Sequence, residues 1–174
     1  VLILVLLTLV LFHPIQWICL NVFGYQAHKK SVDYLNFVLL KIVILLGTTF
    51  KFENRESIPK GVPIIFVANH QSLYDIIMSI WYLRRFHPKF VSKKELAKGI
   101  PSVSYNLRHG GSVVIDRKNP KQAIPKIKKI AEYIEKHTRS AVIFPEGTRS
   151  KDGKPKEFAE TGLKKKKKNA PSAY

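Results

Sequence analysis

The segment NHQSLYD at residues 69–75 follows directly on the apolar run PIIFVA at residues 63–68. A short β-branched and aromatic run that gives way to polar residues is typical of a buried strand that ends in a loop. Ser72 then suits a helix N-cap, with Asp75 at position N3 and an apolar helical pattern after it. The segment therefore predicts a strand, a turn and a helix, with His70 at the carboxyl end of the strand.

His70 and Asp75 lie on either side of this turn, so the chain can bring the two side chains together. A carboxylate on one imidazole nitrogen fixes the tautomer and leaves the other nitrogen free to act as a general base. The alternative interpretation is structural: Asp75 only caps its helix and His70 is an ordinary loop histidine. The spacing by itself does not separate the two interpretations.

The composition limits the class of protein and of partner. A chain of 174 residues is one domain's worth, long enough to bury a core. Its 30 Lys and Arg residues outnumber 12 Asp and Glu residues, which gives a net charge of +18. That charge favours a polyanionic neighbour: nucleic acid, an anionic membrane surface or a phosphorylated substrate. The lone Cys19 excludes a disulfide framework within the chain and a cysteine-rich metal site.

Apolar residues dominate the amino-terminal part of the chain. Residues 1–28 include no formally charged side chain, and a second apolar stretch at residues 34–50 has a single charge, Lys41. A spanning helix needs about 20 mostly apolar residues. We expect two helices joined by a polar loop at residues 27–33, as a membrane-associated hairpin that spans the bilayer or lies partly embedded in it. The second apolar stretch argues against a removable signal peptide.

Predicted strands and helices alternate through the rest of the chain. We expect strands at residues 48–54, 64–68, 89–91, 112–115 and 140–144, and helices at residues 72–83, 93–106 and from residue 119 onward. This alternation predicts a layered α/β domain with a mostly parallel or mixed sheet flanked by helices. Asn119 offers the last helix an N-cap with Gln122 at N3, although Pro125 favours a regular start nearer residue 124.

Polar side chains follow three of the predicted strands. His70, Arg117 and the segment at residues 146–149 each come directly after a strand. In parallel sheets the carboxyl ends of the strands gather the site residues at one edge. We therefore expect these residues to share one cleft, although an arginine taken singly could equally be a solvated surface charge.

Three sequence blocks resemble those of one protein family. Residues 69–75 match the pattern NHxSxxD, and residues 111–117 (GSVVIDR) resemble a glycine, an apolar run and then Ile-Asp-Arg, with Val114 where the family often has an aromatic residue. Residues 144–150 (FPEGTRS) fit the third block at every position. From about residue 50 to residue 162 the chain resembles the glycerolipid acyltransferase superfamily, most closely the 1-acyl-sn-glycerol-3-phosphate (lysophosphatidate) acyltransferases.

The resemblance implies transfer of an acyl chain from a thioester to the sn-2 hydroxyl of lysophosphatidate, which makes phosphatidate. It implies that His70 takes the hydroxyl proton and that Asp75 orients His70. No covalent acyl-enzyme is implied, so Ser72 is expected to be a helix cap and not a nucleophile. Arg117 and Arg149 are implied phosphate ligands, because a guanidinium presents a fork to two oxygen atoms.

The resemblance also implies an acceptor pocket shaped by Glu146, Gly147 and Thr148: Glu146 accepts a hydrogen bond and Gly147 lets the backbone approach closely. Lys93 and Lys94 are further phosphate candidates, although a solvated position is the better interpretation. We expect no metal and no cofactor, with acyl-CoA or acyl carrier protein as the donor substrate. The expected location is a membrane, with the catalytic domain on its cytoplasmic face.

The chain departs from the family after the third block. Where the family continues into an apolar helix and a fourth block, residues 164–168 are five consecutive lysines. Such a run repels itself, so we expect a solvated tail. We accordingly expect a helical hairpin at residues 1–47, a catalytic domain at residues 48–162 that is incomplete at its carboxyl end, and a lysine-rich tail at residues 163–174.

Two alternatives to lysophosphatidate acylation remain open. The same chemistry could act on glycerol-3-phosphate, another lysophospholipid or a lyso-aminolipid. A catalytically silent basic protein could instead bind a membrane surface or nucleic acid. A nucleic-acid role would need aromatic side chains among the basic ones, and the lysine-rich stretches at residues 121–129 and 164–168 have none. We therefore expect membrane lipid, and not nucleic acid, as the partner.

Overall fold

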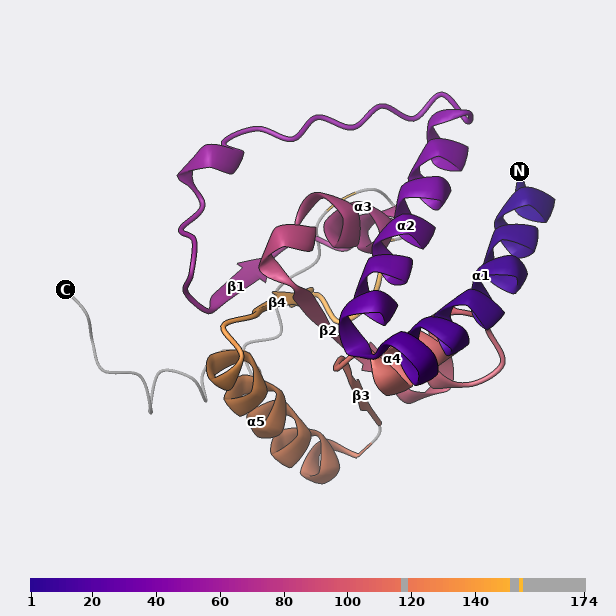
Figure 1. Cartoon of the computed structure of the whole chain (residues 1–174). Coiled ribbons are helices and arrows are strands. Elements are labelled where there is room, and N and C mark those ends of the chain that lie inside the picture. Colours follow the sequence, from indigo (N-terminus) through magenta and orange to yellow (C-terminus); the bar gives the residue numbers. More distant parts are fainter. Residues whose placement is uncertain (117–118, 151–153, 155–174) are drawn as a thin grey trace.

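Two long helices precede an α/β domain in the computed structural model, which describes residues 1–116, 119–150 and 154 (Figure 1). Helices α1 (Leu2–Phe23) and α2 (Tyr25–Ile44) form a hairpin and pack against each other along their length. The chain reverses at Gly24, whose φ of 81° lies in the left-handed region that glycine adopts at little cost. The predicted helical hairpin is therefore confirmed.

The predicted polar loop at residues 27–33 is wrong, because these residues form the first turns of α2. Their charges suggested a solvated loop, yet two of them stabilise the helix. Lys29 and Asp33 lie one helical turn apart and form an ion pair. The turn itself needs only the glycine that precedes α2.

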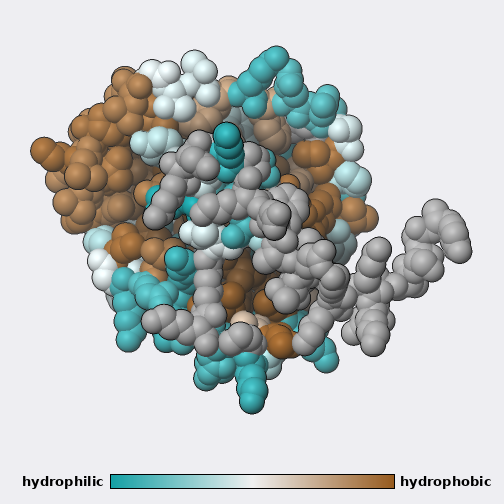
Figure 2. Space-filling model, turned by 180° about the vertical axis from the view of Figure 1, so that it is seen from behind, coloured by the Kyte–Doolittle hydropathy of each residue, from teal (hydrophilic) through white to brown (hydrophobic). Residues whose placement is uncertain are grey.

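The two helices of the hairpin differ in how they meet the rest of the molecule. The buried face of α2 forms a core cluster of Leu35, Leu39 and Ile42, on which the inner side of α1 packs. By contrast, α1 leaves most of its apolar side chains exposed, and they form a hydrophobic area on one side of the molecule (Figure 2). Among the described helices, α1 is the one long and apolar enough to cross a membrane.

A four-stranded sheet forms the centre of the α/β domain. Its strands are β1 (Ile64–Val67), β2 (Pro88–Lys93), β3 (Val113–Ile115) and β4 (Ser140–Ile143). They lie in the order β1-β4-β2-β3, and every pair is parallel, which confirms the predicted sheet type. On β4, Val142 lies opposite Phe66 of β1 and Phe90 of β2. These strands bury their centres in a cluster of Leu83, Phe90 and Val142.

Helices cover the two faces of this sheet (Figure 1). They are α3 (Tyr74–Tyr82), α4 (Val103–His109) and α5 (Pro120–Lys136), with short 3₁₀ turns at Arg55–Ser57, Arg84–Phe86 and Lys94–Ala97. On one side α5 packs its apolar stripe against β3 and β4. On the other side α3 packs against the sheet and α2, which connects the hairpin to the domain.

The predicted strand at residues 48–54 is absent, and the chain runs there as an irregular segment between α2 and β1 (Figure 1). An extended segment becomes a strand only when a neighbour takes up its backbone hydrogen bonds. Among the described residues, no strand pairs with this segment. Its charged pair, Lys51 and Glu53, is exposed to solvent.

Two helix predictions differ from the structure. The helix predicted at residues 93–106 is replaced by the end of β2, a 3₁₀ turn and the short α4, since Gly99 and Ser102 both adopt positive φ. The start predicted near residue 124 is also wrong: α5 begins four residues earlier, at Pro120. Asn119 caps it by accepting a hydrogen bond from the Gln122 N–H at 3.4 Å, so one proline in the second turn does not delay the helix.

Replacing Ile134 by Ala should lower the free energy of unfolding by about 2–5 kcal/mol, because Ile134 is 5% exposed between Ile130 and Ala141 and its truncation leaves a cavity. Ile124 lies on the same helix but is 46% exposed, so Ile124→Ala should change stability by less than about 0.5 kcal/mol. Urea denaturation followed by circular dichroism measures both. Equal losses in the two variants would contradict the packing of α5.

Candidate active site

The segment that carries His70 leaves the sheet at the carboxyl end of β1. The Ala68 N–H donates to the Ile143 carbonyl at 3.1 Å, so the parallel pairing with β4 continues to the last residue before the turn. The chain then turns and enters α3, with Asp75 in its first turn. A strand end and a helix start thus hold His70 and Asp75 from two sides.

The turn brings the two side chains into contact. His70 Nδ1 lies 3.0 Å from Asp75 Oδ2, and the same oxygen accepts hydrogen bonds from the backbone N–H groups of Gln71 at 2.8 Å and Ser72 at 2.9 Å. A carboxylate only accepts, so Nδ1 carries the proton and Nε2 keeps a lone pair. The side chains of His70 and Asp75 are 14% and 21% exposed, which leaves the imidazole within reach of a ligand.

The structure is compatible with both interpretations of Asp75, the functional one and the structural one. Its carboxylate takes up the two backbone donors of the turn, which is a capping role, and it also contacts the imidazole. The predicted N-cap at Ser72 is one residue too early, because α3 begins at Tyr74 with Leu73 as its cap residue. Ser72 still contributes locally, since its Oγ accepts from the Tyr74 N–H at 3.2 Å.

Phe144 fixes the plane of the His70 ring. The two rings stack with their centroids 4.3 Å apart and their planes 23° apart. Phe144 follows β4 directly, and β4 is the neighbour of β1, the strand that precedes His70. No role for Phe144 was predicted from its sequence position; the available signal was its place as the first residue of the FPEGTRS block.

The third block also holds the backbone of His70. Glu146 is 8% exposed, and its Oε1 accepts from the His70 N–H at 2.9 Å. The Ser150 N–H donates to the His70 carbonyl at 2.9 Å. The structure thus gives Glu146 a partner that the sequence did not predict, and its contact with an acceptor molecule stays a prediction.

A tight turn separates Glu146 from the exposed end of the block. Gly147 adopts a φ of 68°, and its N–H donates to the Phe144 carbonyl at 3.0 Å. A Cβ at this position would meet open space, so the backbone conformation, and not crowding, requires the glycine. Thr148 and Arg149 follow and are exposed, in the segment whose Ser150 N–H donates to the His70 carbonyl. The other predicted phosphate ligand, Arg117, lies outside the described residues.

Other charged groups near this edge have structural partners. Lys94 forms an ion pair with Asp116, which connects the ends of β2 and β3. This pairing raises the pKa of Lys94 above its ordinary value, through the hydrogen bond and the charge of Asp116. Among the described residues, no three His, Cys, Asp or Glu side chains converge to form a metal site.

This arrangement is suited to proton transfer. The oriented imidazole presents Nε2 at the carboxyl edge of a parallel sheet, where ligands bind in open α/β folds. A carboxylate at this position would stabilise the imidazolium that a proton on Nε2 would create. The edge therefore has the geometry of a general base beside an exposed basic surface, while the roles of the individual side chains remain predictions.

Comparisons with known proteins agree with the geometry. A family model described as Acyltransferase matches residues 49–169. The chain is 39% identical over 109 residues to a 1-acyl-sn-glycerol-3-phosphate acyltransferase of Helicobacter pylori, covering 61% of this chain and 43% of that protein. It is 35% identical over 109 residues to the Saccharomyces cerevisiae protein of the same name, covering 62% of this chain and 34% of that protein. The chain thus spans less than half the length of these relatives.

A solved structure is similar over most of the chain. The crystal structure of the 1-acyl-sn-glycerophosphate (LPA) acyltransferase PlsC from Thermotoga maritima aligns with a TM-score of 0.71 at 27% sequence identity. The alignment covers 94% of this chain and 67% of that one, so it includes the hairpin as well as the sheet. Because the family model matches most of the chain and the first and third sequence blocks meet at His70, the chain belongs to the Acyltransferase family.

Proposed function

We propose that this chain transfers an acyl group from a thioester to the sn-2 hydroxyl of 1-acyl-sn-glycerol-3-phosphate, which yields phosphatidate. The observation that carries the proposal is the 3.0 Å contact between His70 Nδ1 and Asp75 at the carboxyl edge of the sheet. The choice of acceptor is supported by the names of the relatives, several of which are 1-acyl-sn-glycerol-3-phosphate acyltransferases.

The reaction needs one proton to move twice. The sn-2 hydroxyl oxygen forms a bond to the thioester carbonyl carbon while His70 Nε2 takes the hydroxyl proton. The tetrahedral intermediate then collapses and its C–S bond breaks, and the leaving thiolate takes the proton back from Nε2. Asp75 stabilises the imidazolium between these events. The reaction thus forms one C–O bond, breaks one C–S bond and passes the hydroxyl proton to the thiolate, and it needs no acyl-enzyme.

The acceptor's phosphate needs positive charge near this base. Arg149 is exposed just beyond the Gly147 turn, in the segment whose Ser150 N–H is bonded to the His70 carbonyl. A guanidinium can bind two phosphate oxygens at once, and Thr148 can add a hydroxyl donor. We propose Arg149 as a phosphate ligand on these grounds and Arg117 on its place in the second block.

We propose that α1 attaches the enzyme to a membrane, because its outer face exposes apolar side chains such as Leu2, Leu7 and Leu11 along its length. The acceptor and the product are membrane lipids, so attachment brings the base to its substrate. Basic residues that follow an apolar helix favour the cytoplasmic side. Lys29, Lys30 and Lys41 follow the end of α1 within about 20 residues, so they support a catalytic domain on the cytoplasmic face. We propose acyl-CoA or acyl carrier protein as the donor.

The acceptor preference separates lysophosphatidate acylation from the same chemistry on another acceptor. Transfer rates with one acyl-CoA donor are measured for lysophosphatidate, glycerol-3-phosphate and a phosphate-free lysolipid in the same detergent. We expect lysophosphatidate to give the highest kcat/KM. A preference for the phosphate-free acceptor would contradict the proposal that Arg149 binds the acceptor's phosphate.

Replacing His70 by Ala should abolish the general base and lower kcat by about 10²–10⁴-fold, because no other group takes the hydroxyl proton. Release of free thiol from acyl-CoA measures the rate. The variant should still float with lipid vesicles to the same extent as the unsubstituted protein, since α1 is unchanged. Unchanged turnover would contradict the assignment of His70, and a catalytically silent membrane protein would show no activity in either form.

Replacing Phe144 by Leu should lower kcat by about 2- to 12-fold and leave the KM for lysophosphatidate unchanged, because a stacked aromatic pair contributes about 0.5–1.5 kcal/mol. The stack at 4.3 Å positions His70 and does not touch the acceptor in this account. Phe144→Tyr keeps the ring and should retain nearly full kcat. Equal losses in the Leu and Tyr variants would show that packing alone, and not the stack, matters there.

A further inference from the structure

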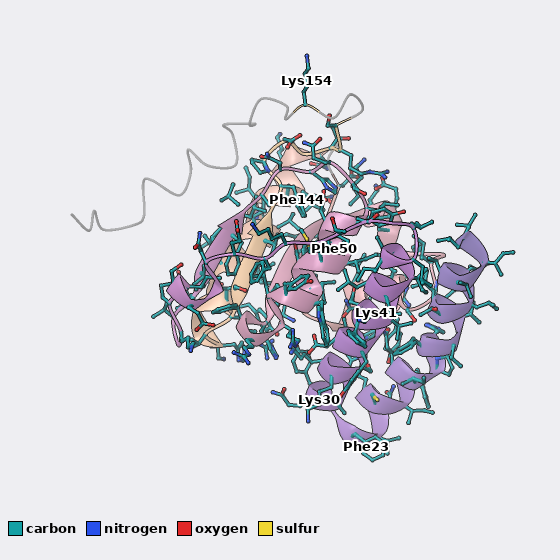
Figure 3. All side chains as sticks on the ribbon, turned by 90° about the horizontal axis from the view of Figure 1, so that it is seen from above. Phe23, Lys30, Lys41, Phe50, Phe144 and Lys154 are labelled. Carbon is teal, nitrogen blue, oxygen red and sulfur yellow. The ribbon has the colours of Figure 1, made fainter. Side chains whose placement is uncertain are left out.

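A second group of basic side chains lies at the edge of the sheet opposite to His70. Lys89 is near the start of β2, and Arg139 directly precedes β4. Lys29, in the first turns of α2, lines the same cavity as Lys89. Figure 3 labels Phe23 at the tip of the hairpin, Lys30 close to it on α2, and Phe144 in the other half of the molecule. We call Lys29, Lys89 and Arg139 the hairpin-turn cluster.

Two members of the hairpin-turn cluster converge on one phenol oxygen. Lys89 Nζ donates to the Tyr25 hydroxyl at 2.7 Å and to the Gly110 carbonyl, and Arg139 Nη1 donates to the same hydroxyl at 3.2 Å. The Arg139 guanidinium also lies 4.7 Å from the centroid of the Tyr25 ring. Lys89 is 6% exposed, yet the hydroxyl and the carbonyl that accept its hydrogen bonds are neutral, and no ion pair joins it to a carboxylate among the described residues.

Among the described residues that line the cavity, a single carboxylate accompanies Lys29 and Lys89. Asp33 lines the same cavity as Lys29 and Lys89, and Lys29 forms an ion pair with it. Lys29 also donates to the Arg84 carbonyl at 2.9 Å. One carboxylate cannot neutralise Lys29 and Lys89 together, and Arg139 adds a cation at the Tyr25 hydroxyl, so the cavity has an excess of positive charge. Groups with that excess bind anions, and phosphate oxygens are the acceptors that lysine and arginine match best.

The titration of a neighbouring histidine agrees with this excess. His87 lines the cavity, and its pKa is lowered to about 4 by burial and by the charges of Lys29, Lys89 and Arg139. Burial also lowers the pKa of Lys89. A bound anion would supply the missing negative charge at this position.

Exposed apolar side chains lie beside the cluster. Val22 and Phe23, at the end of α1, are 66% and 69% exposed, and Trp17, earlier in the same helix, is 54% exposed. Tryptophan and tyrosine favour the headgroup level of a bilayer. Tyr25 lies within the cluster itself. The chain thus places an apolar tip and an unneutralised cationic cavity next to each other, which matches the acyl chain and the phosphate of one lipid.

We propose that the hairpin-turn cluster binds the phosphate of an anionic phospholipid of the surrounding bilayer, with the acyl chains of that lipid against the exposed side of α1. The acceptor of the reaction is not this lipid, because His70 and Glu146 lie at the carboxyl edge of the sheet whereas Lys89 and Arg139 lie at the amino edge. The inference rests on the membrane attachment proposed above but not on acyl transfer.

Native mass spectrometry of the detergent-solubilised protein tests the site with phosphatidylglycerol and phosphatidylcholine as probes. The unsubstituted protein should retain phosphatidylglycerol in preference to phosphatidylcholine. The Lys29→Gln, Arg139→Gln double variant should lose about tenfold or more of that preference, because each basic side chain contributes about a fivefold gain in binding an anionic lipid. The matched control removes two exposed lysines of α5, through Lys121→Gln and Lys129→Gln, and should keep the preference.

The outcomes separate this inference from the proposed function. Retention of phosphatidylcholine reports attachment through α1, and thiol release in detergent reports acyl transfer; neither should change in the double variant, because Lys29 and Arg139 are outside the acyl-transfer site. Equal retention of the two lipids by the unsubstituted protein would overturn the inference. If the control variant lost as much of the preference for phosphatidylglycerol as the double variant, the inference would also be overturned, because the preference would then reflect general charge attraction.

A second measurement needs no substitution. The pKa of His87 is followed by NMR in zwitterionic micelles and again after phosphatidylglycerol is added. A phosphate at the cluster stabilises the imidazolium, so the pKa should rise from about 4 to about 5 or higher. Salt at about 1 M screens the potential of the micelle surface, whereas it screens a partly buried contact much less. A rise of the His87 pKa that vanishes in this salt would contradict binding at the cluster.

Discussion

The hydrogen bonds to one carboxylate oxygen organise the active edge of this protein. Asp75 Oδ2 accepts from two backbone N–H groups of the turn and contacts His70 Nδ1. The same atom therefore closes the strand-to-helix turn and sets the tautomer of the imidazole. The local fold and the proposed acid–base chemistry thus depend on the same carboxylate oxygen, which His70 reaches across a turn and not along one helix.

The parallel sheet supplies the long-range part of the site. Because β1 and β4 are neighbours and run in the same direction, the segments that follow them emerge side by side. Phe144 then stacks on the His70 ring, and Glu146 takes up the His70 N–H. At the other edge the hairpin-turn cluster adjoins the exposed end of α1. In the functions proposed above, one edge serves acyl transfer and the other binds lipid.

Local patterns in the sequence predicted the parts that depend on neighbours in the chain: the apolar hairpin, the strand before His70, the Asn119 cap and the turn that joins His70 to Asp75. They did not predict contacts that form across the sheet, because Glu146 and His70 are 76 positions apart and only the strand order brings them together. The predicted strand at residues 48–54 failed because a strand also needs a partner. The predicted loop at residues 27–33 failed because its charges pair within a helix.

The central claim is that His70 and Asp75 act as one unit, and a double-mutant cycle on kcat tests it most directly. Turnover is measured for Asp75→Asn, for His70→Ala and for the protein with both substitutions. If the carboxylate acts only through the imidazole, Asp75→Asn lowers kcat in the unsubstituted protein but adds nothing once His70 is absent. Losses that multiply in the doubly substituted protein would contradict the account, because Asp75 would then contribute to turnover independently of His70.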